Sequence, residues 1–294
     1  MTSPVSISET TIDRLADACE RSIYESISVS HCSLHAAWQH QFSARGKRSR
    51  MRLAINSSLQ LGLSAEQSEV LASACELVHQ ASLIHDDLMD SDTHRNGKPT
   101  VWHAFGSATA ICLGDALLVE AMCRVVAVPN VANTARTALA QLFRDSIHAA
   151  ADGQIDDCSI DKIANFKYSD YCIAVRKKSG ALFALPVLAA MIARDFSADE
   201  QNIVWQAYAE FGIAYQLLDD LHDKDEDKGQ RLNGYWILQR ESEQEASDKL
   251  YATVMQHLSY AETLLNRLPY AVKHSFYAVR DDMLAKIPKL KAVI

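Results

Sequence analysis

The sequence predicts an all-α fold, because helix-forming residues dominate and residues that interrupt helices are rare. Only 10 glycines and 6 prolines occur in 294 residues, while alanine, leucine, glutamine, glutamate and lysine are common. Hydrophobic residues make up 48% of the chain, which is enough to bury a sizeable core. No low-complexity linker or sharp change of composition divides the chain, so we expect one helical domain over residues 1–294.

Apolar residues recur at helical spacing in ten segments. In the clearest one they follow steps of four and three from Val70 to Leu88, as one face of an α-helix requires. Ser64 and Gln67 form a predicted capping box before this helix, and residues 96–99 lie in the loop beyond it. Helices are expected over residues 9–28, 32–42, 48–60, 64–90, 106–127, 131–151, 167–192, 197–223, 243–266 and 270–287.

The helix expected over residues 197–223 repeats the plan of the earlier one. Ser197 and Glu200 form another predicted capping box, and apolar residues continue at helical spacing to Leu218. In both segments the first aspartate, Asp86 or Asp219, follows the cap residue by 22 residues. At about 1.5 Å per residue, two helices of equal length therefore carry acidic residues at the same end.

Each of these helices ends in a cluster of three aspartates: Asp86, Asp87 and Asp90 in the first, and Asp219, Asp220 and Asp223 in the second. Residues three or four positions apart share a helix face, so the carboxylates of one cluster can reach a common ion. Without a cation the cluster is unfavourable, because like charges repel and the helix dipole disfavours anions there. Mg²⁺ suits such carboxylates and would stabilise a diphosphate leaving group. The alternative is two exposed acidic helix ends.

Basic side chains near these helices could complete a diphosphate site. Lys47 and Arg50 lie at helical spacing, Arg95 follows the first cluster, and Lys178 precedes a small turn. His79 shares a helix face with the first aspartate cluster. Taken singly, each of these residues has the simpler interpretation of a solvated or satisfied surface group.

Two further stretches have weaker interpretations. His31 and His35, with His40 nearby, resemble half of a zinc site, but no second ligand pair follows at a suitable spacing. Gly153 and Gln154 begin a stretch that could be a polar helix kink beside a cavity or a plain helix end. The sequence leaves that choice open.

Charge and hydropathy exclude several classes of partner. The net charge of −8 argues against nucleic acid and against anionic membranes. The most apolar stretch, residues 181–193, contains Pro186 and is too short to span a bilayer. The seven cysteines are scattered and are expected to be small buried residues in a reducing compartment. No secretory signal is visible, so we expect a cytoplasmic protein.

Together these motifs resemble the trans-type prenyl diphosphate synthases, in particular geranylgeranyl diphosphate synthases. The resemblance rests on Gly46-Lys47-x-x-Arg50, ELVHQASLIHDDLMD, the 97–100 loop, Gly153-Gln154, Lys178-Ser179-Gly180 and YQLLDDLHD, in order over residues 40 to 225. It implies one antiparallel helical bundle of the isoprenoid synthase type with a central active-site cavity, and a homodimer. It also implies condensation of an allylic prenyl diphosphate with isopentenyl diphosphate.

The resemblance assigns a role to each matching residue. It implies that Mg²⁺ is bound by both clusters, Asp86, Asp87, Asp90, Asp219, Asp220 and Asp223, and that Asp86, Asp87, Asp219 and Lys178 take part directly in catalysis. The allylic diphosphate would be held by Arg95 and Lys178, with Ser179 and Gln216 beside it. Isopentenyl diphosphate would be bound by Lys47, Arg50 and His79.

Product length is expected to depend on the turn before the first cluster. The growing tail should run back along that helix, past Ala81 and Ser82. Both side chains are small, whereas short-chain members of the family carry an aromatic residue there. The resemblance therefore implies a product of twenty carbons or more, with geranylgeranyl diphosphate the best single expectation.

Two departures from the family pattern leave other functions open. Asn96 stands where the family has a second arginine, and an amide cannot replace a bidentate cation. The loop over residues 224–231 is also shortened. Both changes affect the isopentenyl diphosphate half, so a terpene cyclase-like enzyme and a non-catalytic partner subunit remain alternatives. Against these alternatives, both aspartate clusters are complete.

Overall fold

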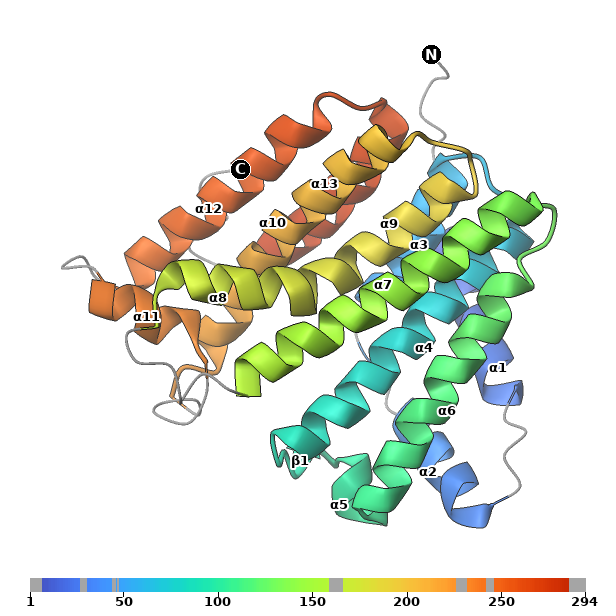
Figure 1. Ribbon diagram of the computed structural model, residues 1–294, viewed down its shortest axis with the longest axis horizontal. Coiled ribbons are helices and arrows are strands. Elements are labelled where there is room, and N and C mark those ends of the chain that lie inside the picture. Colours follow the sequence, from blue (N-terminus) through green and yellow to red (C-terminus); the bar gives the residue numbers. More distant parts are fainter. Residues whose placement is uncertain are drawn as a thin grey trace. The chain divides into compact units, whose positions relative to one another are not determined.

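The computed structural model describes residues 7–26, 31–43, 46, 48–158, 166–225, 232–241 and 246–285. The described residues form helices and one two-stranded hairpin, which confirms the all-α class (Figure 1). They group into two compact units. The N-terminal unit contains Ser3–Arg144 and Ala189–Asp195, and the C-terminal unit contains Asp145–Leu188 and Phe196–Ile294.

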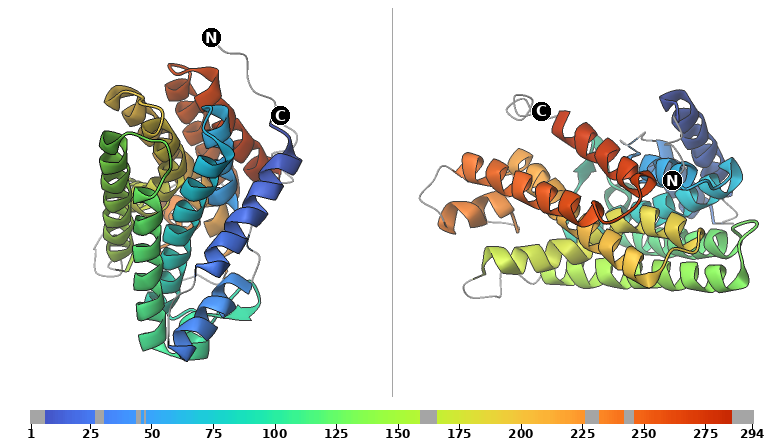
Figure 2. Two further views of the ribbon diagram at one scale, coloured as in Figure 1. Left: turned by 90° about the vertical axis from the view of Figure 1, so that its right-hand side faces the viewer. Right: turned by 90° about the horizontal axis from the view of Figure 1, so that it is seen from above.

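In the N-terminal unit the long helix α4 lies against α1, α3 and α6 (Figure 2, left). Its buried residues, including Leu71, Leu77 and Ile84, supply much of the core of this unit. The elements are α1 (Glu9–Glu25), α2 (Cys32–Ser43), α3 (Ser49–Gln60), α4 (Ala65–Met89), β1 (His94–Arg95), β2 (Lys98–Pro99), α5 (Val101–Phe105), α6 (Ser107–Val126) and the first part of α7 (Asn133–Cys158).

In the C-terminal unit α10 lies beside α12 and packs against a short π-helix, η2 (Figure 1). Its core is aromatic: the rings of Phe183 and Phe211 are 5.0 Å apart, and Phe276 lies 5.8 Å from Phe211. The elements are the rest of α7, α8 (Tyr168–Val175), η2 (Arg176–Gly180), most of α9 (Ala181–Ile192), α10 (Ala198–His222), α11 (Gly234–Glu241), α12 (Ala246–Leu265) and α13 (Tyr270–Ala285).

Both capping boxes are confirmed, and they explain where the two aspartate-bearing helices begin. Ser64 Oγ accepts a hydrogen bond from the Gln67 amide at 3.1 Å, and the Ser64 amide donates to Gln67 Oε1 at 2.9 Å. Ser197 and Glu200 exchange the same pair of bonds at the start of α10. Each box satisfies two amides that a helix start leaves without partners.

Several element boundaries differ from the expectation. The predicted 167–192 helix is three pieces, because the π-turn η2 separates α8 from α9. The short elements α5, α11 and the hairpin were not predicted, since each is too short to show a period. Gly153 lies near the C-terminal end of α7, and a Cβ there would come within 2.5 Å of the Lys178 amide nitrogen, so the stretch that it begins is the end of a helix that also packs closely against η2.

The cysteine prediction is only partly right. Cys19, Cys75 and Cys172 are buried, but Cys32, Cys112, Cys123 and Cys158 are exposed, and none of the seven forms a disulfide. In the described part of the chain no helix has both the length and the apolarity to cross a membrane. The same residues contain no group of three His, Cys, Asp or Glu side chains placed to hold a metal, so the weak zinc signal gains no support.

Candidate active site

The first aspartate cluster lies at the C-terminal end of α4, as predicted. Asp86 and Asp87 are in the last turn, and Asp90 is the C-cap residue, whose amide donates to the Asp86 carbonyl at 2.8 Å. Asp86 and Asp90 are half-buried, whereas Asp87 is only 2% exposed. The three carboxylates therefore meet different surroundings, although the sequence motif treats them alike.

Asp87 is engaged by Arg95, the cation that follows the cluster. Arg95 Nε and Nη2 donate to Asp87 Oδ1 at 2.7 Å and 2.5 Å. Burial raises the pKa of the Asp87 carboxyl from its ordinary value, although the Arg95 guanidinium acts in the opposite direction. The structure thus brings together two predicted site residues in an ion pair and gives Asp87 a protein partner for its charge.

The hairpin turn next to Arg95 explains why asparagine stands at position 96. The strands β1 and β2 pair His94 with Pro99 and Arg95 with Lys98, so Asn96 and Gly97 form a two-residue hairpin turn. Their φ angles are 50° and 75°, both in the left-handed region that such a turn requires, and Asn-Gly is the favoured pair there. In the same register Lys98 pairs with Arg95, and Lys98 Nζ donates to Ser43 Oγ on α2 at 3.3 Å.

Arg50 and His79 also lie together, on α3 and α4. Arg50 Nη1 is 3.2 Å from His79 Nε2. Because a guanidinium only donates, His79 Nε2 is the acceptor and the ring proton is on Nδ1. Burial and the positive charges of Arg50 and Arg95 lower the pKa of His79 well below its ordinary value, so the ring is neutral at pH 7. Lys47 lies outside the described residues.

The two predicted chain-length residues lie on α4, within two turns of Asp86. Ala81 is fully buried, and Ser82 is half-buried with its hydroxyl donating to the His79 carbonyl at 2.8 Å. Neither side chain projects bulk from this part of the helix. The prediction that they set product length stays a prediction.

The second aspartate cluster lies at the end of α10, and its middle member, Asp220, accepts several hydrogen bonds. Tyr171 OH and the Gly234 amide donate to Asp220 Oδ2 at 2.8 Å and 2.6 Å, and Gln216 Nε2 donates to Oδ1 at 2.9 Å. Asp220 is 4% exposed, whereas Asp219 is half-buried and Asp223, the C-cap residue, is exposed. Asp220 therefore occupies the position in this cluster that Asp87 has in the first.

Lys178, Ser179 and Gln216 line one small cavity of about 30 Å³ in the C-terminal unit, beside Tyr171 and Asp157. Lys178 Nζ donates to Asp157 Oδ2 at 2.8 Å, and Ser179 Oγ donates to Gln216 Oε1 at 3.0 Å. Lys178 and Ser179 belong to the π-helix η2, and single π-turns inside α-helices are frequent at functional sites. Three predicted site residues are thus neighbours.

Magnesium fits these clusters only with ligands from outside the protein. Asp87 and Asp220 direct carboxylate oxygens at protein donors, and in neither cluster do the described residues present three close metal-ligating side chains. Mg²⁺ usually takes one or two protein carboxylates and fills its other positions with water and phosphate oxygens. Asp86, Asp90, Asp219 and Asp223 are less buried than Asp87 and Asp220, so a metal that brings its own water and phosphate ligands would meet their carboxylates first.

Sequence reasoning missed several residues that shape the site. Tyr171 stands seven residues before Lys178, two helical turns away, and that spacing could have indicated a shared face. Asp157 belonged to the stretch after Gly153 that was left undecided. Asn233 and Gly234 carried no signal, yet Asn233 Nδ2 donates to the Asp220 carbonyl at 2.8 Å.

The sequence profile of the polyprenyl synthetase family matches residues 31–232, more than half of the chain. The chain belongs to the polyprenyl synthetase family. It is 34% identical to geranylgeranyl pyrophosphate synthase from Geoglobus acetivorans over 194 residues, 65% of this chain and 59% of that relative. It is 32% identical to farnesyl diphosphate synthase from Haemophilus influenzae over 230 residues, 76% of each chain.

A third relative is short chain isoprenyl diphosphate synthase from Methanothermobacter thermautotrophicus, 32% identical over 211 residues, 71% of this chain and 64% of the relative. The chain thus spans about six tenths of the length of the two archaeal relatives. Solved structures of polyprenyl synthetases share the fold. Geranylgeranyl pyrophosphate synthetase from Geoglobus acetivorans superposes with a TM-score of 0.79 at 24% identity over 92% of this chain and 97% of that one. Geranyltranstransferase from Thermotoga maritima superposes with a TM-score of 0.76 at 21% identity, over 92% and 96%.

Proposed function

We propose that this chain is a Mg²⁺-dependent prenyltransferase that joins an allylic prenyl diphosphate to isopentenyl diphosphate. The observation that carries the proposal is that each aspartate cluster has a cationic side chain of its own unit close by. Arg95 bonds to Asp87. Lys178 lines the same cavity as Gln216, which bonds to Asp220. Carboxylates for a metal and cations for phosphate oxygens are the two kinds of group that a metal-bound diphosphate requires.

In the proposed reaction the bond between C1 and oxygen of the allylic diphosphate breaks, and the electron pair leaves with the diphosphate. The aspartate clusters would hold Mg²⁺, which would supply positive charge to stabilise this leaving group. Arg95 and Lys178 hold the diphosphate, and Ser179 and Gln216 orient it from the same side. The double bond of isopentenyl diphosphate, bound by Lys47, Arg50 and His79, attacks the cation. The new carbon–carbon bond forms, and the departing diphosphate takes the lost proton.

We further propose a product of at least twenty carbons, with geranylgeranyl diphosphate the first candidate. Ala81 and Ser82 support this, because neither blocks the path of a growing tail with an aromatic ring. For both clusters to bind one diphosphate, this proposal requires that they face one another across one apolar cavity, within a single helical domain. Such a cavity would protect the carbocation from water.

We also propose that the enzyme is a homodimer and that it is cytoplasmic. An apolar stripe on α6 supports it, because Ile111, Val119 and Val126 are 48%, 63% and 50% exposed. Their spacing of eight and seven residues puts them on one face of that helix. A second copy of the chain with the same stripe would bury this surface.

Incubation with labelled isopentenyl diphosphate, Mg²⁺ and each allylic primer in turn tests the proposed function. Label in a longer prenyl diphosphate is the expected result, and EDTA should abolish it until excess Mg²⁺ is added. Consumption of primer alone with release of a hydrocarbon would instead identify a terpene cyclase-like enzyme. No turnover of any primer would favour a non-catalytic partner subunit.

A further inference from the structure

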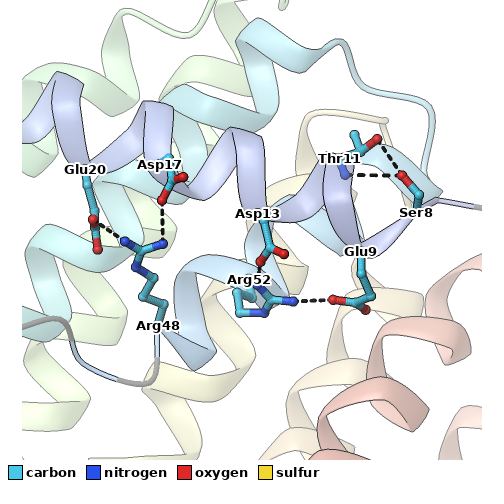
Figure 3. Close-up of polar contacts among 8 residues, drawn as sticks. All are labelled: Ser8, Glu9, Thr11, Asp13, Asp17, Glu20, Arg48 and Arg52. Atoms are coloured by element: carbon cyan, nitrogen blue, oxygen red, sulfur yellow. Dashed lines mark hydrogen bonds and ion pairs between the residues drawn. The ribbon is translucent and has the colours of Figure 1, made fainter.

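Helix α1 carries a stripe of four carboxylates that form ion pairs with two arginines at the start of α3 (Figure 3). The stripe consists of Glu9, Asp13, Asp17 and Glu20, which share one helix face. Arg48 donates to Asp17 Oδ1 at 2.9 Å and also pairs with Glu20. One turn further along, Arg52 pairs with Asp13 and Glu9.

Arg48 has an unusual backbone conformation at this point. It is the N-cap residue of α3, with φ 53° and ψ 25°, and its side chain makes no capping hydrogen bond. A residue with a Cβ is strained in this left-handed region and persists there only when its surroundings hold it. The two ion pairs to α1 can stabilise this conformation. They are partly shielded from solvent, since the Arg48 side chain is only 14% exposed.

The strained turn leads directly to Arg50, two residues later. Arg50 reaches His79 on α4. One turn before His79 the buried carboxylate of Glu76 accepts from Gln80 Nε2 at 2.6 Å, and Gln41 Nε2 donates to Gln80 Oε1 at 2.7 Å. Arg48 therefore ties the start of α3 to α1. The face of α4 that Arg50 contacts is ordered by the hydrogen bonds of Glu76 and Gln80.

We propose that Arg48 is a positioning residue, through which the acidic stripe of α1 fixes the turn that places Arg50 against His79. Arg48 has no place in the proposed substrate site, since its guanidinium points to α1, where it pairs with Asp17 and Glu20. The inference rests on the proposed role of Arg50 and His79 in binding isopentenyl diphosphate. It adds α1, which carries none of the predicted site residues, to the elements that determine affinity for that substrate.

The test compares variants on both sides of the contact. Arg48→Gly keeps the left-handed turn, because glycine adopts it without steric cost, but removes both ion pairs. Asp17→Asn with Glu20→Gln removes the same ion pairs and leaves every residue of α3 unchanged. We expect each to raise KM for isopentenyl diphosphate about tenfold, with KM for the allylic substrate unchanged. Combined, they should raise it no further than Arg48→Gly alone, because they break one contact.

Arg52→Gln is the matched control, since it also removes two ion pairs between α1 and α3. It should leave both KM values unchanged, and Arg48→Lys should give an intermediate KM. An equal effect of Arg52→Gln, or a rise in KM for both substrates, would reduce Arg48 to a general structural contact. If the wild-type enzyme is active and Arg48→Gly has the same KM values as the wild type, the inference is overturned and the proposed function still stands.

A second measurement does not depend on turnover. In ¹⁵N-histidine NMR, wild-type His79 should stay neutral as the pH falls through the ordinary histidine range, because its pKa is lowered by burial and by the charges of Arg50 and Arg95. In Arg48→Gly and in the α1 double variant, displacement of Arg50 should raise the midpoint, while Arg52→Gln should not. An unchanged His79 titration in both variants would overturn the inference even if the protein makes no product.

Discussion

At the scale of single residues, the middle aspartate of each cluster differs from its neighbours. Asp87 and Asp220 are 2% and 4% exposed and accept hydrogen bonds from protein donors. Buried carboxylates need such partners, because an unpaired buried charge is strongly destabilising. We therefore expect substitutions within one cluster to separate into losses of catalysis and losses of stability.

Asp86→Ala should lose activity without losing the fold. Asp86 is half-buried at the end of α4, and its proposed partner is a metal ion. We expect kcat to fall at least about a hundredfold, because a group that stabilises developing charge is removed. Steady-state kinetics measure this effect, with circular dichroism and Tm as controls. Turnover equal to wild type would contradict the assignment of Asp86 to the metal.

Asp220→Asn should lose stability first. The substitution replaces one acceptor oxygen by an NH₂ group, so one of the donors Tyr171 OH, Gly234 N–H or Gln216 NH₂ must lose its partner. We expect a loss of about 2 kcal/mol in the free energy of unfolding, measured by denaturant titration. Tyr171→Phe removes a single hydrogen bond and should cost about half as much. If Asp220→Asn unfolds at the wild-type midpoint, this network is not a stabilising one.

Glu210 should make stability depend on pH. It accepts from Arg176 Nη2 at 2.7 Å and lies 2.5 Å from His257 Nδ1, while Tyr168 OH lies 2.8 Å from the other ring nitrogen, His257 Nε2. Burial opposes ionisation of Glu210, but hydrogen bonds from His257 and Arg176 keep its pKa below the ordinary value. The stabilisation is therefore present above the ordinary glutamate pKa and is lost as the pH falls through the lower folded value.

Glu210→Gln should consequently unfold more easily than wild type at pH 7, by about 1–2 kcal/mol, because Arg176, which solvent reaches on one side, loses the carboxylate. The difference between the two proteins should shrink as the pH falls below about 4.5, the ordinary pKa of a glutamate. Urea titrations of both proteins from pH 7 to pH 3 measure it. A difference that stays constant with pH would show that the charge of Glu210 is not what stabilises the contact.

At the scale of elements, the close approach of α10 and η2 depends on two glycines. A Cβ on Gly212 would lie 2.6 Å from the Gly180 Cα and 2.7 Å from its nitrogen, and these backbone atoms cannot turn aside. The contact holds the η2 segment that carries Lys178 and Ser179 against the helix that carries the second cluster. Neither the π-turn nor this crossing could be predicted from the local sequence.

Gly212→Ala should therefore be destabilising, although alanine favours helices. We expect a loss of about 2 kcal/mol from overpacking, partly offset by about 1 kcal/mol of helix propensity. Thermal unfolding measures the net change. Gly46→Ala serves as the control, because a Cβ there would meet nothing within 4 Å. Equal Tm values for the two variants would mean that the helices separate without cost.

At the scale of the whole molecule, the proposed dimer makes the exposed face of α6 an interface. Val119 lies at the centre of the stripe and is 63% exposed. Val119→Arg should dissociate the dimer, because each copy would place a charge in an apolar contact. Light scattering after size exclusion should show the mass falling from two chains to one, with the helical content unchanged. A variant that remains dimeric would place the interface elsewhere.

The sequence by itself determined the helical class, both capping boxes and the ends of the two aspartate-bearing helices. These features are local: a period of 3.6 residues and a cap three residues long are visible within one segment. The motifs were also sufficient to indicate the polyprenyl synthetase family, which the profile match over residues 31–232 confirms. That the two clusters face one another stays a prediction.

Only the tertiary structure decided which side chains become hydrogen-bond and ion-pair partners. Asp220 receives its hydrogen bonds from Tyr171, 49 residues earlier, and from Gly234, 14 residues later. Arg48 is paired by α1, and Arg95 is turned onto Asp87 by a hairpin too short to show a pattern. Contacts of this kind depend on which helices become neighbours. Helix packing is a property of the folded chain, so no local spacing could have distinguished the buried middle aspartates from the others beside them.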